Sequence, residues 1–397
     1  MILLLAVIWP LGAFVLSITN YNHRDFRIGV YAIAVMFALC AQIVATDTFT
    51  ADITRNLEHA VAYKDLPWLF LLLEKDFFLG VSGKLLCYIS DDLRFLYVCY
   101  ILIKTTLFLK CVGIVVNNIP PTIKKIHLLP LLSMIFVTTF YEVNSTRFTI
   151  ASIFFVWCTL EILINHNKRF YGFIFLSPLI HFSFWLVMPL PFLYKVLKNK
   201  TKLVWLIFAF SFIFSLASTS LLMNKFAEKN MSESVSRGVG VYASEEGLEN
   251  MEERYAEGAR SGNLNRAISR SIVDVRNYGV MICVAFFSIY CYRRNNKDGI
   301  VAQLMNYLLL LYSFANIANS NSQGVRFYLV TAELAVFFLV MMMYRSEGMY
   351  TVFFNDNKKW FNSVYYLTTI AGFLYLFIGR STLNLFGVLF GNYFIHF

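Results

Sequence analysis

Residues 169–195 read RFYGFIFLSPLIHFSFWLVMPLPFLYK, and this stretch decides the topology. Basic residues flank it on both sides, with Lys168 and Arg169 before it and a lysine-rich segment from Lys195 onward. A single helix would place the two basic clusters on opposite sides of a membrane, whereas a hairpin turning near His181 places both inside. With the hairpin, ten Lys and Arg residues of the short downstream segments lie inside and two lie outside. The positive-inside rule therefore favours the hairpin.

Each arm of that hairpin has about 12 residues, roughly 18 Å of helix, which is too short for an ordinary crossing. Three prolines interrupt the arms further, namely Pro178, Pro189 and Pro191. Irregular backbone at this depth is stable only when it is buried in protein or lines a water-filled cavity. We therefore expect a broken re-entrant helical hairpin over 170–195, whose turn around Ser177, His181 and Ser183 borders a polar cavity that opens outward.

The composition is that of a protein surrounded by lipid. Hydrophobic residues make up 58% of the 397 residues and charged residues only 15%, where soluble domains carry about 25%. A soluble enzyme, a nucleic-acid-binding protein and a secreted disulfide scaffold are excluded, and the net charge of +10 collects in short loops on one side of the membrane. No Cys or His spacing suggests a metal site, so neither a metal nor another cofactor is expected.

The apolar runs predict an all-α polytopic membrane protein, a single integral-membrane domain of about ten transmembrane helices plus the broken hairpin. The expected spans are 1–19, 29–46, 93–115, 126–140, 148–164, 203–223, 278–291, 300–317, 327–344 and 363–378. The first is read as a retained span and not as a signal peptide. Both termini and two long loops, 47–92 and 224–277, then face outward. The run 66–73 within the first loop is too short to span and predicts an interfacial or re-entrant helix.

Carboxylates on the outer side are candidate bases. Asp47 and Asp52 stand just beyond the second span. They are either residues of a solvated loop, with Asp47 as a helix N-cap, or carboxylates at a cavity mouth that can act as general bases. Glu142 lies in the short outer turn 141–147 and is a third candidate.

Outward arginines are candidate anion ligands. Arg147 and Arg326 each follow a polar outward turn and open a span. Both the helix dipole and the positive-inside tendency oppose an arginine there, and a bound anion would offset both costs. The alternative for Arg326 is snorkelling to lipid headgroups. Guanidinium groups bind phosphate bidentately, and Arg270 and Arg276, before the eighth span, can complete such a cluster. His181, at the hairpin turn, is either a structural hydrogen-bonding residue or a catalytic one.

Four segments together resemble the motifs of EpsG-like, Wzy-type polysaccharide polymerases. These are Asn-Ser-Thr-Arg-Phe at 144–148, Ser-Pro-Leu-Ile-His-Phe-Ser at 177–183, Thr-Asp-Thr at 46–48 and Val-Arg-Phe-Tyr at 325–328. The chain departs from the pattern after the early Asp, where an aromatic residue is replaced by Ala51 or Asp52. Which of the two carboxylates is the equivalent one is therefore left open.

The resemblance implies a GT-C-like glycosyltransferase of the bacterial inner membrane with its active site facing the exterior. Such an enzyme joins oligosaccharide repeat units of an O-antigen or capsule, carried on undecaprenyl pyrophosphate as donor and acceptor. Arginines (Arg147, Arg326, Arg276 and Arg270) would hold the pyrophosphate, and Asp47, Asp52, Glu142 or His181 would accept the hydroxyl proton. Membrane lipid is the other expected partner and nucleic acid is not. The sequence leaves open whether a polysaccharide chain-length regulator binds.

Other functions share some of these features. Broken helices and buried charges also occur in transporters, so a flippase for a lipid-linked sugar is the first alternative, although no internal repeat is visible. An O-antigen ligase uses the same donor chemistry and is the second. A non-catalytic scaffold would leave the outward arginines and the broken helix unexplained.

Overall fold

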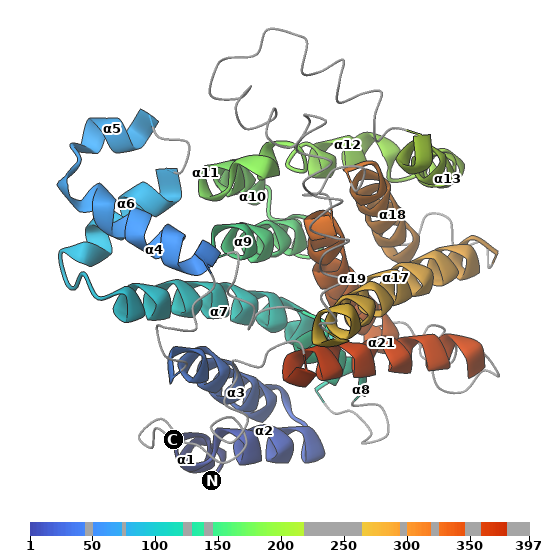
Figure 1. The fold of residues 1–397 in the computed structure, drawn as a ribbon. Coiled ribbons are helices and arrows are strands. Elements are labelled where there is room, and N and C mark those ends of the chain that lie inside the picture. Colours follow the sequence, from blue (N-terminus) through green and yellow to red (C-terminus); the bar gives the residue numbers. More distant parts are fainter. Residues whose placement is uncertain are drawn as a thin grey trace, which may run out of the picture. The chain divides into compact units, whose positions relative to one another are not determined.

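The computed structural model describes residues 1–43, 51–73, 77–121, 129–138, 146–217, 264–293, 300–318, 325–345 and 359–378, and these are helical with no strand among them (Figure 1). The all-α prediction is therefore confirmed for this part of the chain. The α-helices are α1 (Ile2–Ile8), α2 (Pro10–Thr19), α3 (His23–Ile43), α4 (Ala51–Ala62), α5 (Trp68–Leu73), α6 (Phe77–Cys87), α7 (Leu93–Asn117), α8 (Leu129–Phe136), α9 (Thr146–Leu163), α10 (Phe170–Phe173), α11 (Ser177–Ile180), α12 (Leu190–Leu197), α13 (Thr201–Ala217), α17 (Leu264–Arg293), α18 (Ile300–Ala318), α19 (Val325–Arg345) and α21 (Lys359–Ile378). Three 3-10 turns join them, η2 (Tyr63–Asp65), η4 (Ile174–Leu176) and η5 (Phe182–Trp185).

The chain divides into two compact units, and the single integral-membrane domain stays a prediction. Among the described residues, unit 1 contains those of 1–189 and 336–362, and unit 2 contains those of 190–335 and 363–378. Each unit is described by itself.

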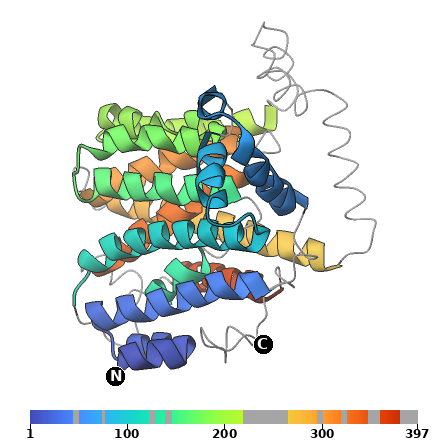
Figure 2. The same ribbon diagram turned by 90° about the vertical axis from the view of Figure 1, so that its left-hand side faces the viewer.

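In unit 1 the long helices pack in layers in chain order, α2 on α3, α3 on α7, and α7 on α9, with α10 and α11 against α9 (Figures 1 and 2). Apolar side chains fill the contacts, and Phe26, Phe108 and Phe155 are fully buried. Small residues let α2 and α3 approach closely, since a Cβ at Gly29 would lie 2.2 Å from the Ser17 hydroxyl oxygen.

The prediction of one span over 1–19 is wrong, because the chain forms two helices that meet at Trp9. Trp9 has φ −147° and ψ 85°, outside the helical region, which a following proline disfavours for its neighbour. Pro10 then opens α2, where its missing N–H leaves no helical partner unsatisfied. The indole of Trp9 packs against Gly12, where an added Cβ would lie 2.1 Å from the ring.

Residues 170–197 are broken into short helical segments. α10, η4, α11 and η5 belong to unit 1, and α12 follows in unit 2. Pro178 lies in the first turn of α11, and the segment ends at His181, whose φ of −149° and ψ of 120° are extended. The discontinuous backbone agrees with the proline spacing, while a hairpin within a membrane stays a prediction.

Residues 51–73 and 77–87 form a helical insert, α4–η2–α5–α6, where the sequence predicted a loop with one interfacial helix. α4 and α6 are in close contact at Gly83, where an added Cβ would lie 2.7 to 2.9 Å from the Cβ, Cα and carbonyl oxygen of Ala60. Only glycine permits this approach.

In unit 2, three hydrogen bonds join α18 to α13 and to Asn199 in the turn just before α13. Gln303 Nε2 donates to Asn199 Oδ1 at 3.0 Å, Asn306 Nδ2 donates to Thr201 Oγ1 at 2.9 Å, and Asn316 Nδ2 donates to Ser211 Oγ at 2.8 Å. Such bonds between apolar helices contribute about 0.6 kcal/mol each. α17 also packs on α18, and a Cβ at Gly279 of α17 would lie 2.1 Å from Thr368 Oγ1 of α21.

Among the described residues, four helices are long and apolar enough to cross a membrane. They are Leu93–Asn117, Ser271–Arg293, Val301–Ala318 and Arg326–Tyr344. α17 begins at Leu264, so residues 264–277 of the expected second outer loop continue directly into the helix of the next expected span. α8 has only 8 residues where the sequence predicted a span over 126–140. The count of ten crossings stays a prediction.

We expect Gly83→Ala to lower the thermal unfolding temperature of the purified protein in detergent, because the added methyl group meets the backbone of Ala60 and overpacking costs about 1–3 kcal/mol. Gly113→Ala in α7 is the matched control. No atom lies within 4 Å of a Cβ at Gly113, so that change should be neutral or stabilising by about 0.5–1 kcal/mol. Equal unfolding temperatures for the two variants would show that α4 and α6 do not pack as described.

Candidate active site

The candidate residues fall into three groups in the structure. Asp47 and Glu142 lie outside the described residues. Asp52 lies in the first turn of α4 and Arg270 on α17. Four remain with side chains in place, Arg147 and His181 in unit 1, and Arg276 and Arg326 in unit 2.

Arg147 is the second residue of α9 and is half-buried. Its Nη2 donates a hydrogen bond to Oδ1 of Asn56 at 3.0 Å, and Asn56 is buried at 7% exposure. Asn56 is neutral, so this hydrogen bond orients the guanidinium and adds no charge of its own. The amino end of α9 adds a partial positive charge at the same place, so this position favours an anion.

His181 lies beside the start of α9, with its ring edge-on to Phe148 at 5.3 Å between centroids. Its Nδ1 accepts a hydrogen bond from the backbone N–H of Ser183 at 3.3 Å and lies 2.8 Å from the Ser183 hydroxyl. A backbone N–H can only donate, so Nδ1 carries a lone pair and the proton of the neutral ring is on Nε2. This geometry favours His181 as a hydrogen-bond donor to substrate over its role as a base.

Tyr100 of α7 and Ser82 of α6 adjoin the same region. Their hydroxyl oxygens are 3.0 Å apart, Tyr100 is 1% exposed, and it lies near enough to Arg147 to interact electrostatically. The guanidinium of Arg147, carried by α9, is therefore oriented by Asn56 of α4 and has Tyr100 of α7 in its vicinity.

Asn56 was missed by the sequence analysis, although a pattern in the sequence could have identified it. Asn56, Leu57 and Ala60 are buried, whereas Glu58 and His59 are exposed, which is the period of an amphipathic helix. A helical reading of 51–62 places a polar amide in the buried stripe, four positions after Asp52.

In unit 2, Arg326 lies at the start of α19 and Arg276 lies within α17. Arg326 is the second residue of α19, as Arg147 is of α9. Arg276 of α17 is 2% exposed and donates from Nε to Oδ1 of Asn277 at 3.2 Å. Two residues after each arginine stands a tyrosine, and the rings of Tyr278 and Tyr328 lie 5.6 Å apart.

A chain of hydrogen bonds holds the start of α19. The hydroxyl of Tyr328 donates to Oδ1 of Asn316, whose Nδ2 donates to Ser211 of α13. The contact of Tyr278 with Tyr328 brings α17 and α19 together two residues beyond each arginine, and convergence of the two guanidinium groups stays a prediction. Whether they share a site with Arg147, which belongs to unit 1, stays a prediction.

No group of three or more His, Cys, Asp or Glu side chains that could hold a metal ion occurs among the described residues. A pocket of about 260 Å³ lies among α1, α2 and α3, lined by Met1, Asn20, Arg24 and Asp25 among others. It contains none of the candidate residues.

The family model of the EpsG family matches residues 84–393, more than three quarters of the chain. The match includes Arg147, His181, Arg276 and Arg326 and begins after Asn56. No curated protein and no solved structure matches the chain. Because the match covers most of the chain and the described helices are apolar, the chain is a membrane protein that belongs to the EpsG family, which is associated with glycosyltransferase-like polysaccharide polymerases.

Proposed function

We propose that this protein polymerises oligosaccharide repeat units carried on undecaprenyl pyrophosphate, at the outer face of the bacterial inner membrane. It would do so as a GT-C-like enzyme with about ten crossings. The family match supports a polysaccharide polymerase-like role. The observation that carries the proposal is Arg147, held by a neutral amide at the amino end of α9, because that arrangement suits a pyrophosphate leaving group.

In the proposed reaction, a hydroxyl oxygen of one lipid-linked unit attacks the anomeric carbon of the sugar on another. The new glycosidic C–O bond forms as the bond from that carbon to the pyrophosphate oxygen breaks. The electron pair leaves with undecaprenyl pyrophosphate, and the hydroxyl proton passes to a base. The leaving group is already an anion, so it needs stabilisation and no protonation.

The residues divide between these two tasks. Arg147, Arg326 and Arg276, with Arg270 as the fourth candidate, would stabilise the charge on the pyrophosphate through preorganised guanidinium groups. His181 would donate its Nε2 proton as a hydrogen bond to a pyrophosphate or sugar oxygen. The base is then a carboxylate, and Asp47, Asp52 and Glu142 are the candidates. Such a base contributes about 10²–10⁴-fold.

Arg147→Ala and Arg326→Ala should each reduce polymer by about 10²–10³-fold, because each removes a donor to the developing charge. The measurement is extension of purified lipid-linked repeat units in detergent, alongside surface analysis of single units in cells. Arg169→Ala, at an exposed arginine of the basic turn, is the control and should be active. Full chain length in either test variant at normal expression removes that arginine from the mechanism. Failure of the wild-type protein to extend glycan without a sealed compartment would instead favour transport.

The variants His181→Gln and His181→Asn distinguish a hydrogen-bond donor role of His181 from a role as the general base. The glutamine amide N–H can replace the Nε2–H donor, while the asparagine oxygen can replace Nδ1 in accepting from Ser183. Neither amide accepts a proton at neutral pH. If His181 donates, the glutamine variant should retain at least about tenfold more activity than the asparagine variant. Equal, complete loss in both variants, with unchanged unfolding temperatures, would indicate that His181 is the base.

Asn56→Asp should lower polymerisation by about tenfold or more, because a carboxylate beside Arg147 binds the guanidinium and repels the pyrophosphate. The unfolding temperature should not fall, since the new group is an ion-pair partner. Asn117→Asp is the matched control, because Asn117 accepts a hydrogen bond from Arg27 elsewhere in unit 1. A similar loss of activity in both variants would exclude a specific role for the Arg147–Asn56 pair.

A further inference from the structure

The helical insert carries an exposed apolar surface that the proposed reaction does not use. We name it the insert patch and define it by seven side chains. They are Leu66 (37% exposed), Trp68 (44%), Leu69 (69%), Phe70 (59%), Leu85 (52%), Tyr88 (64%) and Ile89 (74%). All belong to α5, α6 and the residues beside them. An apolar concentration of this kind marks an interaction surface.

The patch stands on a well-defined frame. Lys84 of α6 is buried at 6% exposure, and its ammonium group donates to the carbonyl oxygens of Lys64 and Leu66. The same ammonium lies 5.2 Å from the centre of the Trp68 ring, within range of a cation–π contact. α6 therefore fixes the start of α5, and Trp68 is held at the surface by a buried charge.

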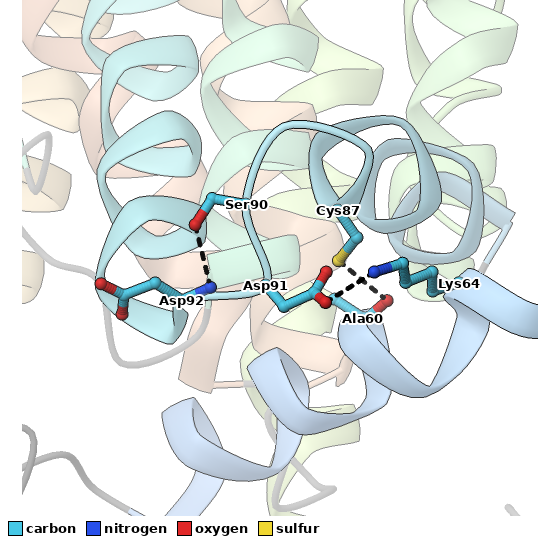
Figure 3. A network of polar contacts seen from close by, with 6 residues as sticks. All are labelled: Ala60, Lys64, Cys87, Ser90, Asp91 and Asp92. Carbon is cyan, nitrogen blue, oxygen red and sulfur yellow. Dashed lines mark hydrogen bonds and ion pairs between the residues drawn. The ribbon is translucent and has the colours of Figure 1, made fainter.

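Polar groups border the insert at its junction with α7 (Figure 3). Lys64 and Asp91 form an ion pair at 2.6 Å, with the two side chains 37% and 47% exposed. The hydrogen bond to Asp91 raises the pKa of Lys64 above its ordinary value, so the lysine stays charged at neutral pH. Beside this pair, the Cys87 thiol donates to the carbonyl oxygen of Ala60, and burial raises its pKa.

α7 connects the patch to the membrane. It begins at Leu93, four residues after Ile89, and it is one of the four described helices that are long and apolar enough to cross. Asp92 caps it by accepting from the Arg94 N–H at 2.8 Å. The chain thus passes from the patch through a short charged turn directly into a spanning helix.

We propose that the insert patch lies in the boundary between lipid headgroups and acyl chains, at the membrane surface where α7 begins. Trp and Tyr are enriched at this depth. The apolar run 66–73 is 8 residues long, about 12 Å as a helix, so we infer that it lies along the interface and does not span. The patch then anchors the insert, and with it Asn56, at a fixed height on the membrane.

The test is spin-label accessibility in vesicles of phosphatidylethanolamine and phosphatidylglycerol. Labels at Leu69→Cys and Phe70→Cys should be reached by oxygen in preference to a water-soluble nickel chelate, as expected about 5–10 Å below the headgroups. Glu58→Cys, on the exposed side of α4, is the matched control and should show the reverse. The described native cysteines are buried or half-buried, and signal from the unsubstituted protein is subtracted. We expect the oxygen-to-nickel ratio at residues 69 and 70 to exceed that at residue 58 by about fivefold or more.

Two results would overturn the proposal. A ratio at residues 69 and 70 equal to that at residue 58 would place the patch in water. Low accessibility to both reagents would mean that protein covers it, as in a second copy of this chain. Because cysteine variants can fold poorly, quenching of Trp68 by brominated lipid is the second measurement, taken as the difference between the unsubstituted protein and Trp68→Phe. No difference would also overturn the proposal.

Discussion

The candidate site depends on one requirement of the backbone. Where the chain is irregular and shielded from water, each N–H and C=O group must find a hydrogen-bond partner within the protein. Around His181 the helix ends and the backbone becomes extended. The N–H of Ser183 is then satisfied by the imidazole Nδ1, and the N–H of Phe184 by the carbonyl of His181 at 3.0 Å. The histidine is thus a structural cap, and the same hydrogen bond puts its proton on Nε2. The hydrogen bond that satisfies the backbone of Ser183 therefore leaves the imidazole of His181 with a donor, Nε2–H, for the substrate.

The arginines use a common kind of contact. Arg147 donates to Asn56 and Arg276 to Asn277, both amides and both buried. An amide oxygen orients a guanidinium through one hydrogen bond, whereas a carboxylate would also offset its charge and compete with a bound anion. Positive charge with a fixed direction is what a pyrophosphate leaving group requires. The hydrogen bond from an arginine to a buried asparagine thus occurs in both units.

The helical insert shows how a segment outside the spans contributes to the site. α4 carries Asn56 and packs on α6 through the contact of Ala60 with Gly83. α6 in turn carries Lys84, which holds the start of α5, and Ser82, which contacts Tyr100. A displacement of α6 would therefore reach Arg147 through α4. The position of one guanidinium depends on packing between three helices and not on α9 alone.

The sequence by itself determined the helical class, the positions of α7, α9, α18 and α19, the interruption of residues 170–197 by prolines, and the place of Arg147 and Arg326 near the start of their helices. These features follow from two local properties, which are the length of the apolar runs and the missing N–H of proline. Only the tertiary structure decided the folding of the insert and the pairing of Arg147 with Asn56 across 91 positions. The physical reason is that a hydrogen bond between residues far apart in the sequence forms only where their helices pack closely. Here the close packing of α4 on α6 depends on Gly83, and no local sequence pattern shows that Gly83 lies against Ala60.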